Sequence, residues 1–229
     1  MIAAVAVCPH PPLLFRELAG HRDVAAELRA ACVRAVSLAT GAGVERVVVI
    51  GGAEATGSWD PTLLVDVRAF GTTGARPNGP SLPLSLGVAR RLLDQAGWRG
   101  PVEMHTVAWD APAAEVRALA DKLTARDEPV ALLVLGEGST RRGEKAPGYL
   151  DERAFAFDEA TGRALATGAT EALAATDAGL AEELMVSGRA PFAVLANAVR
   201  AEGATPRAEL VYQDDPWGVM YYVATWRLG

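Results

Sequence analysis

The chain has 229 residues, a length that favours a single α/β domain. Half of the residues (50%) are hydrophobic and 22% are charged, which is typical of a globular protein rather than a disordered chain. Its formal net charge of −6 and its pI near 5.2 argue against a nucleic-acid-binding protein, which normally presents a basic face. Two cysteines, Cys8 and Cys32, are too few for a disulfide scaffold or a structural zinc cluster.

Targeting and membrane signals are weak in this sequence. The apolar runs fall far short of the roughly 18 residues that a membrane span needs. The apolar N-terminus has no basic region before it and runs directly into Pro9, which disfavours a signal peptide. We therefore expect a cytoplasmic protein with reduced thiols and no membrane partner.

The N-terminal third predicts a strand–helix–strand unit. Residues 2–7 form a short apolar run typical of a buried strand. Asp23 precedes apolar residues at three- and four-residue spacing up to position 39, which predicts an N-cap and an amphipathic helix. Residues 44–50 predict a second buried strand that ends at Gly51 and Gly52. The long crossover implies that the two strands run parallel, with a right-handed connection.

The middle of the chain continues the alternation of strands and helices. Residues 53–61 and the Gly/Pro/Asn-rich stretch 70–80 read as loops, and such a long irregular stretch is expected to be functional or mobile. The predicted elements here are a strand at 63–67, a helix at 84–96, a strand at 102–107, a helix at 113–125 and a strand at 130–135.

The last third predicts helices followed by a hairpin. A polar loop covers 137–151, and a helical pattern extends over 158–201 with breaks near Asp177 and Gly188. Strands at 208–212 and 219–226 flank a turn. We expect one α/β domain over residues 1–229, with a mixed central sheet, antiparallel last strands and helices on both faces.

Polar residues follow three predicted strands at the carboxyl ends, where open α/β sheets place their working crevice. These residues are His10, Glu54 and the segment that begins at Glu137, and the hairpin tip adds Asp214 and Asp215. A histidine and two or three carboxylates meeting at one edge would make a divalent-metal site. The alternative is that His10 caps a proline-rich turn and the acids are solvated loop residues.

Other candidate motifs are less specific. His21 is most simply a surface residue, and His105 is most simply a half-buried structural residue within a strand. A Cys8–His10 nucleophile pair is conceivable, since residues two apart on a strand share a face. The Gly51-Gly52 pair lacks a phosphate-loop pattern, and Ser139 lacks the spacing of a nucleophile elbow.

Several motifs together resemble the class III extradiol ring-cleavage dioxygenase superfamily, which includes the subunit-B-like dioxygenases and the Memo-like proteins. The motifs span most of the chain in order, at residues 8–14, 136–141, 146–149, 157–159 and 187–192 and in the closing hairpin. The resemblance implies a single α/β domain around a mixed sheet. It also implies a non-haem Fe(II) site of two histidines and one carboxylate that leaves positions open for a catecholate and O2.

This chain departs from the family pattern at several positions. The first metal histidine matches His10, but the segment after the second strand contains no histidine. The acid/base histidine of the family falls on Thr140, which cannot accept a proton near neutral pH. Memo-like proteins have a cysteine directly before a Gly-Arg pair. In this chain Ser187 takes the place of that cysteine, and Arg189 is the arginine of the pair.

Two hypotheses follow from this resemblance. In the first, the chain is a divergent metal-dependent oxidoreductase that acts on a small aromatic or anionic substrate. It would hold Fe(II), Mn(II) or Zn(II) with His10, Glu54 and Asp214, or with Glu137 in place of Asp214. The reaction would use Glu137, Thr140 and Arg141, and Ser187 and Arg189 would contact substrate.

In the second hypothesis, the fold has lost its metal, carries no cofactor and works as a binding or interaction protein. Both hypotheses expect a small-molecule ligand and no nucleic acid. Trp217, Tyr221 and Trp226 could support a homo-oligomer, although aromatic residues in a terminal hairpin are more often part of the core.

Overall fold

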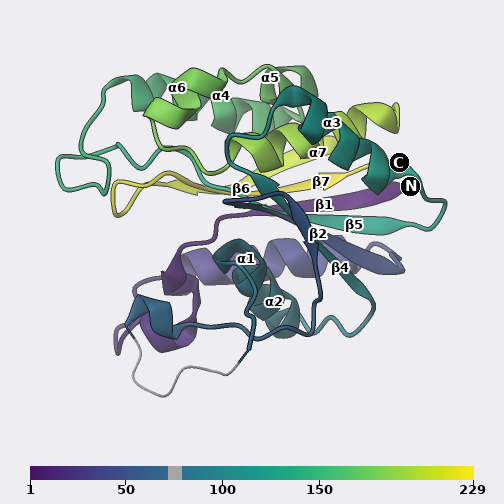
Figure 1. Ribbon diagram of the computed structural model, residues 1–229, viewed down its shortest axis with the longest axis horizontal. Helices are drawn as coiled ribbons and strands as arrows, with labels where there is room; N and C mark the ends of the chain where they lie inside the picture. Colours follow the sequence, from purple (N-terminus) through teal and green to yellow (C-terminus); the bar gives the residue numbers. More distant parts are fainter. Residues whose placement is uncertain (72–78) are drawn as a thin grey trace.

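The computed structural model describes residues 1–71 and 79–229, and these residues form one mixed β-sheet between two layers of helices (Figure 1). Helices α1 and α2 cover one face, below the sheet in the view, and α3 to α7 cover the opposite face. The predicted α/β class and the helices on both faces are confirmed. No helix within the described residues has the length and apolar character needed to cross a bilayer.

The sheet contains seven strands within the described residues. They are β1 (Ile2–Cys8), β2 (Arg46–Ala53), β3 (Gly57–Trp59), β4 (Val102–Ala108), β5 (Val130–Leu135), β6 (Arg207–Asp214) and β7 (Tyr221–Arg227). Their order is β3-β4-β2-β5-β1-β7-β6. The central strands β4, β2, β5 and β1 are parallel, whereas β3, β7 and β6 each pair with their neighbour in antiparallel fashion.

The helices connect the parallel strands by crossovers and then form a longer helical segment before the hairpin. They are α1 (Ala26–Thr40), α2 (Leu84–Gln95), α3 (Ala113–Thr124), α4 (Arg153–Thr167), α5 (Thr170–Ala174), α6 (Ala178–Glu183) and α7 (Arg189–Ala201). The predicted breaks near Asp177 and Gly188 coincide with the N-caps of α6 and α7. Within this segment α4 begins at Arg153, five residues before the predicted start.

Every residue of β5 is buried, because helices pack on both faces of this central strand. Alternate residues of β1, β2 and β5 point into two separate cores, one shared with α3 and α7 and the other with α1 and α2. The predicted parallel pair is correct in direction, but β5 lies between β1 and β2. The carboxyl ends of these three strands therefore lie side by side at one edge of the sheet.

Four local predictions are wrong. Asp23 does not cap α1; it adopts a positive φ of 43° and forms an ion pair with Arg29. Strand β2 does not end at residue 51 but extends to Ala53. Within the part of the chain that the structure describes, the expected strand at 63–67 contributes only an isolated bridge from Leu64, and the short strand β3 lies within the expected loop. The expected connection at 70–80 falls largely outside the described residues.

The closing hairpin is confirmed, and it joins the sheet next to β1. Its aromatic residues are not an exposed oligomer surface: Trp226 and Tyr221 are buried, and Trp217 packs edge-on against Tyr221. The backbone N–H of Leu228 donates to the carbonyl of Ala3, so the two ends of the chain lie close together (Figure 1).

Candidate functional site

His10 and Glu137 follow the adjacent strands β1 and β5, and the structure brings them together. The Glu137 carboxylate accepts a hydrogen bond of 2.8 Å from the His10 backbone N–H, and it lies 3.7 Å from the imidazole Nδ1. His10 is buried, and among the described residues its Nδ1 has no hydrogen-bond partner. Because a buried polar atom without a partner is unfavourable, this nitrogen is available to a ligand or a water molecule.

The polar loop that begins at Glu137 is anchored by a buried ion pair. Asp158 of α4 is fully buried; its carboxylate accepts from the Ser139 backbone N–H at 2.9 Å and lies 3.2 Å from the Arg142 guanidinium. Burial raises the pKa of Asp158, against the opposing effects of its hydrogen bonds and of Arg142. Arg142 also pairs with Asp215 of the hairpin. The loop is thereby held between α4 and the turn after β6.

Thr140 and Arg141 lie in the middle of this loop, next to residue Met185. A Cβ atom built on Gly148 would lie 2.6 Å from Arg141 Cγ, 2.9 Å from Met185 Sδ and 3.1 Å from Thr140 Oγ1, so glycine is required for this close approach. The Thr140 hydroxyl is buried and has no hydrogen-bond partner within residues 1–71 and 79–229. Two of the predicted catalytic positions therefore meet the segment between α6 and α7.

A cavity of about 610 Å³ opens beside this segment, at the carboxyl edge of the sheet. It is lined by Glu54 after β2, Trp109 and Asp110 after β4, and residues of α6 and the start of α7, including Glu182, Met185, Ser187 and Arg189. Three of the predicted site residues, Glu54, Ser187 and Arg189, thus share one cavity. Such a volume is in the range of small-molecule sites.

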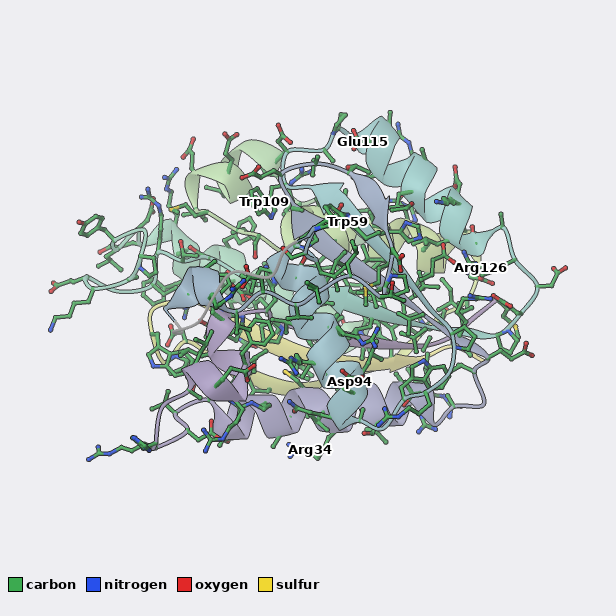
Figure 2. All side chains as sticks on the ribbon, turned by 60° about the horizontal axis from the view of Figure 1, so that its bottom comes forward. Arg34, Trp59, Asp94, Trp109, Glu115 and Arg126 are labelled. Atoms are coloured by element: carbon green, nitrogen blue, oxygen red, sulfur yellow. The ribbon has the colours of Figure 1, made fainter. Side chains whose placement is uncertain are left out.

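The wall of this cavity is fixed by Arg189 and Trp109. The Arg189 guanidinium donates through Nη2 to the backbone carbonyls of Trp109 and Ala111, at 2.6 and 3.1 Å. Burial lowers the pKa of Arg189, while Asp110 raises it, and the side chain stays charged because an arginine does so throughout the physiological range. Trp109 is 47% exposed and presents its ring at the surface, near the start of α3 (Figure 2).

The charged groups in the cavity lining are mainly acidic. The lining contains the three acidic residues Glu54, Asp110 and Glu182 and one basic residue, Arg189, whose guanidinium is already bonded to the backbone. The lining also carries the apolar side chains of Trp109 and Met185. This combination favours a small ligand with an apolar body and a positively charged group.

The predicted metal set of His10, Glu54 and Asp214 is not assembled. Neighbouring strands lie about 4.8 Å apart, so β6 places Asp214 roughly 10 Å from β1 and about 19 Å from β2. Asp214 instead bonds to the Tyr212 hydroxyl and the Asp215 backbone N–H. Across residues 1–71 and 79–229, no three His, Cys, Asp or Glu side chains are grouped as metal ligands would be. The donor set does not fit an iron centre of two histidines and one carboxylate.

Trp109 and Asp110 are functional candidates that the sequence analysis missed. They follow β4 directly, and β4 is parallel to β2, so the same strand-end rule applies to them. Glu182 and Met185 are a different case. They reach the cavity from the helical segment α6–α7, and their contribution depends on how that segment folds back over the sheet.

Comparison with known proteins bears on the fold. The sequence matches no protein-family model and no curated protein. The structure is similar to the crystal structure of the uncharacterized protein JW3007 from Escherichia coli K12. The TM-score is 0.50 and the sequence identity 15%, and the match covers 98% of this chain and 99% of that one. At this identity the similarity supports the single-domain α/β architecture alone.

Proposed function

We propose that this protein binds a small organic cation, an amine with an apolar or aromatic body, in the cavity at the carboxyl edge of its sheet. The observation that carries the proposal is the lining itself, which contains Trp109, three acidic residues and one backbone-bonded arginine. The exposed indole offers a cation–π surface, and the carboxylates offer charge complementarity. On this proposal the protein works as a binding protein on the fold of the family that its sequence resembles.

A matched pair of ligands tests the sign of the required charge. 2-Phenylethylamine and 3-phenylpropanoate have similar size and apolar surface but opposite charge near neutral pH. We expect the amine to raise the melting temperature and to quench tryptophan fluorescence, because a ligand that binds only the folded state stabilises it. The carboxylate is expected to do neither. Stronger stabilisation by the carboxylate would refute the proposal.

Variants of the lining locate the site. Trp109→Leu removes the ring and is expected to weaken amine binding by about 0.5–2 kcal/mol. Glu182→Gln removes one exposed carboxylate and is expected to weaken it by roughly 0.2–1 kcal/mol. Glu115→Gln serves as the control, because Glu115 is a partly exposed acid that lies on α3 and not in the cavity lining (Figure 2).

A divergent metal-dependent oxidoreductase is the second candidate, and the contact between His10 and Glu137 favours it. The pair offers one imidazole and one carboxylate at adjacent strand ends. The test is titration of the untagged protein with Fe(II), Mn(II) and Zn(II), followed by calorimetry on His10→Ala. Stoichiometric binding that is lost in the variant, together with oxygen uptake on a catechol panel, would support this candidate over the binding protein.

A further inference from the structure

A second group of polar side chains lies away from the cavity, on the edge formed by β3 and β4. Ser58 of β3 is the direct antiparallel partner of His105 in β4, and Glu103 precedes His105 by two residues on the same face. Lys122 near the end of α3 and Arg126 just after it complete the group. In Figure 2 the labelled Trp59 marks β3 and Arg126 marks the end of α3.

The three residues from the strands form a continuous chain of hydrogen bonds. The Ser58 hydroxyl lies 3.0 Å from His105 Nδ1, and His105 Nε2 lies 2.6 Å from a carboxylate oxygen of Glu103. His105 is 2% exposed, whereas Ser58 is exposed on the edge strand. A buried imidazole thus connects an accessible hydroxyl to a carboxylate. Serine nucleophiles on unrelated folds are activated by the same order of groups, with the roles of the two ring nitrogens exchanged relative to this site.

The protonation states required for this activation follow from the surroundings. Burial lowers the pKa of His105; Glu103 opposes this effect, whereas Lys122 and Arg126 add to it. The imidazole is therefore neutral near pH 7. Because the Glu103 carboxylate can only accept, the ring proton lies on Nε2, and the Nδ1 lone pair faces the Ser58 hydroxyl.

Two cations support the group from the helical side. The Arg126 guanidinium donates to both oxygens of Glu103, at 3.1 and 3.4 Å, and so fixes the carboxylate. Burial raises the pKa of Glu103, but hydrogen bonds from Arg126 and His105 outweigh it and lower the pKa overall. The Lys122 ammonium donates to the Ser58 oxygen at 3.2 Å, where it would stabilise negative charge that develops on that atom.

We propose that Ser58 is a nucleophile for small activated carboxylic esters, with His105 as its general base and Glu103 as the positioning residue for His105. The Ser58 oxygen attacks the acyl carbon, and its proton passes to His105 Nδ1. The ester C–O bond breaks, and His105 returns the proton to the departing alcohol. Water then hydrolyses the acyl-serine by the same exchange, which releases the carboxylic acid and restores the hydroxyl.

The test is covalent labelling of the intact protein with a fluorophosphonate, followed by peptide mapping. Ser37 is the internal control, because it is exposed on α1 and hydrogen-bonds there through its backbone carbonyl. General-base activation predicts that Ser58 reacts about a hundredfold faster than Ser37. The labelling rate is expected to rise with pH and to level off above an apparent pKa lower than that of a free histidine.

Variants separate the roles within the group. Ser58→Ala is expected to abolish the fast label and the hydrolysis of p-nitrophenyl acetate, and Ser37→Ala to change neither. Glu103→Gln is expected to slow labelling and to shift its pH profile, an effect that a purely structural role would not produce. Lys122→Met changes an exposed side chain, so it tests how much the ammonium group contributes to the reactivity of the Ser58 oxygen without disturbing the core. Equal labelling of Ser58 and Ser37 in the native protein would overturn the proposal, whether or not a His105→Gln variant folds.

Discussion

Replacing Arg142 with methionine is expected to destabilise the protein by about 3–5 kcal/mol near pH 7, because it leaves the buried Asp158 carboxylate without a counter-ion. Asp158 is fully buried and the Arg142 side chain is only 12% exposed, so solvent screens their interaction little. The other partner of Arg142, Asp215, is 33% exposed and can be solvated when the guanidinium is lost. For a chain of this size the loss corresponds to a fall in melting temperature of roughly 6–20 °C.

The pH dependence of this loss identifies its cause. Burial raises the pKa of Asp158 in the folded state, so the folded protein takes up this proton more readily than the unfolded chain. The associated stability is fully present below the unfolded-state pKa and is lost as the pH rises through the folded-state pKa. Removing Arg142 raises that pKa further. The destabilisation by Arg142→Met is therefore expected to be largest near pH 7 and to shrink as the solution is acidified.

Urea unfolding of four proteins measures the effect: the native chain, Arg142→Met, Asp158→Asn and the double variant. The asparagine Oδ1 can still accept from the Ser139 backbone N–H, so the double variant is expected to recover all but about 1–3 kcal/mol of the loss. If the double variant is no more stable than Arg142→Met, or if the loss is the same at all pH values, the buried charge is not its cause.

Three further outcomes are expected. In Gly52→Ala the new Cβ would lie 2.7 Å from Trp109 Nε1, so the indole ring must move. Calorimetry is therefore expected to show weaker amine binding. Unchanged affinity would argue that the ring is not part of the site. Because burial lowers the pKa of His105, its contribution to stability is present above the unfolded-state pKa of about 6.5 and is lost as the pH falls through the folded-state pKa. Melting temperatures of His105→Gln are therefore expected to fall less on acidification than those of the native chain, and parallel curves would count against this. Trp226 is fully buried and donates through Nε1 to a backbone carbonyl at 2.8 Å. Trp226→Phe is therefore expected to lower the free energy of unfolding in urea by about 2–3 kcal/mol. A change near zero would show that the site repacks freely.

Elements with strong local signals were predictable from the sequence. Strand β5 matches the predicted range at both ends, because an unbroken apolar run is bounded by a proline and a glycine. Strand β3 has three residues, one of them glycine, and it exists only because β4 offers an edge for it to pair with. Residues 63–67 carry a strand-like pattern, but among residues 1–71 and 79–229 they pair through one bridge only. Pairing partners, and not local propensity, decided these two segments.

The same distinction applies to the candidate site. The strand-end rule places His10 and Glu137 at the same edge of the sheet, and they meet there because β1 and β5 are neighbours. It did not predict their distance from Asp214, because strand order is set by how helices cross the sheet and not by the residues at the strand ends. Likewise, the bond between Ser58 and His105 depends on the register of β3, which the sequence leaves open.

The position of β1 has a consequence for how the chain folds during its synthesis. This strand is translated well before β7, yet it lies inside the sheet, and β7, which is formed by residues 221–227, is one of its two neighbours. Until those residues have left the ribosome, one side of β1 presents unpaired backbone groups that could join a strand of another nascent chain. Chaperone protection of the incomplete polypeptide would then matter most until residues 221–227 are available to pair with β1.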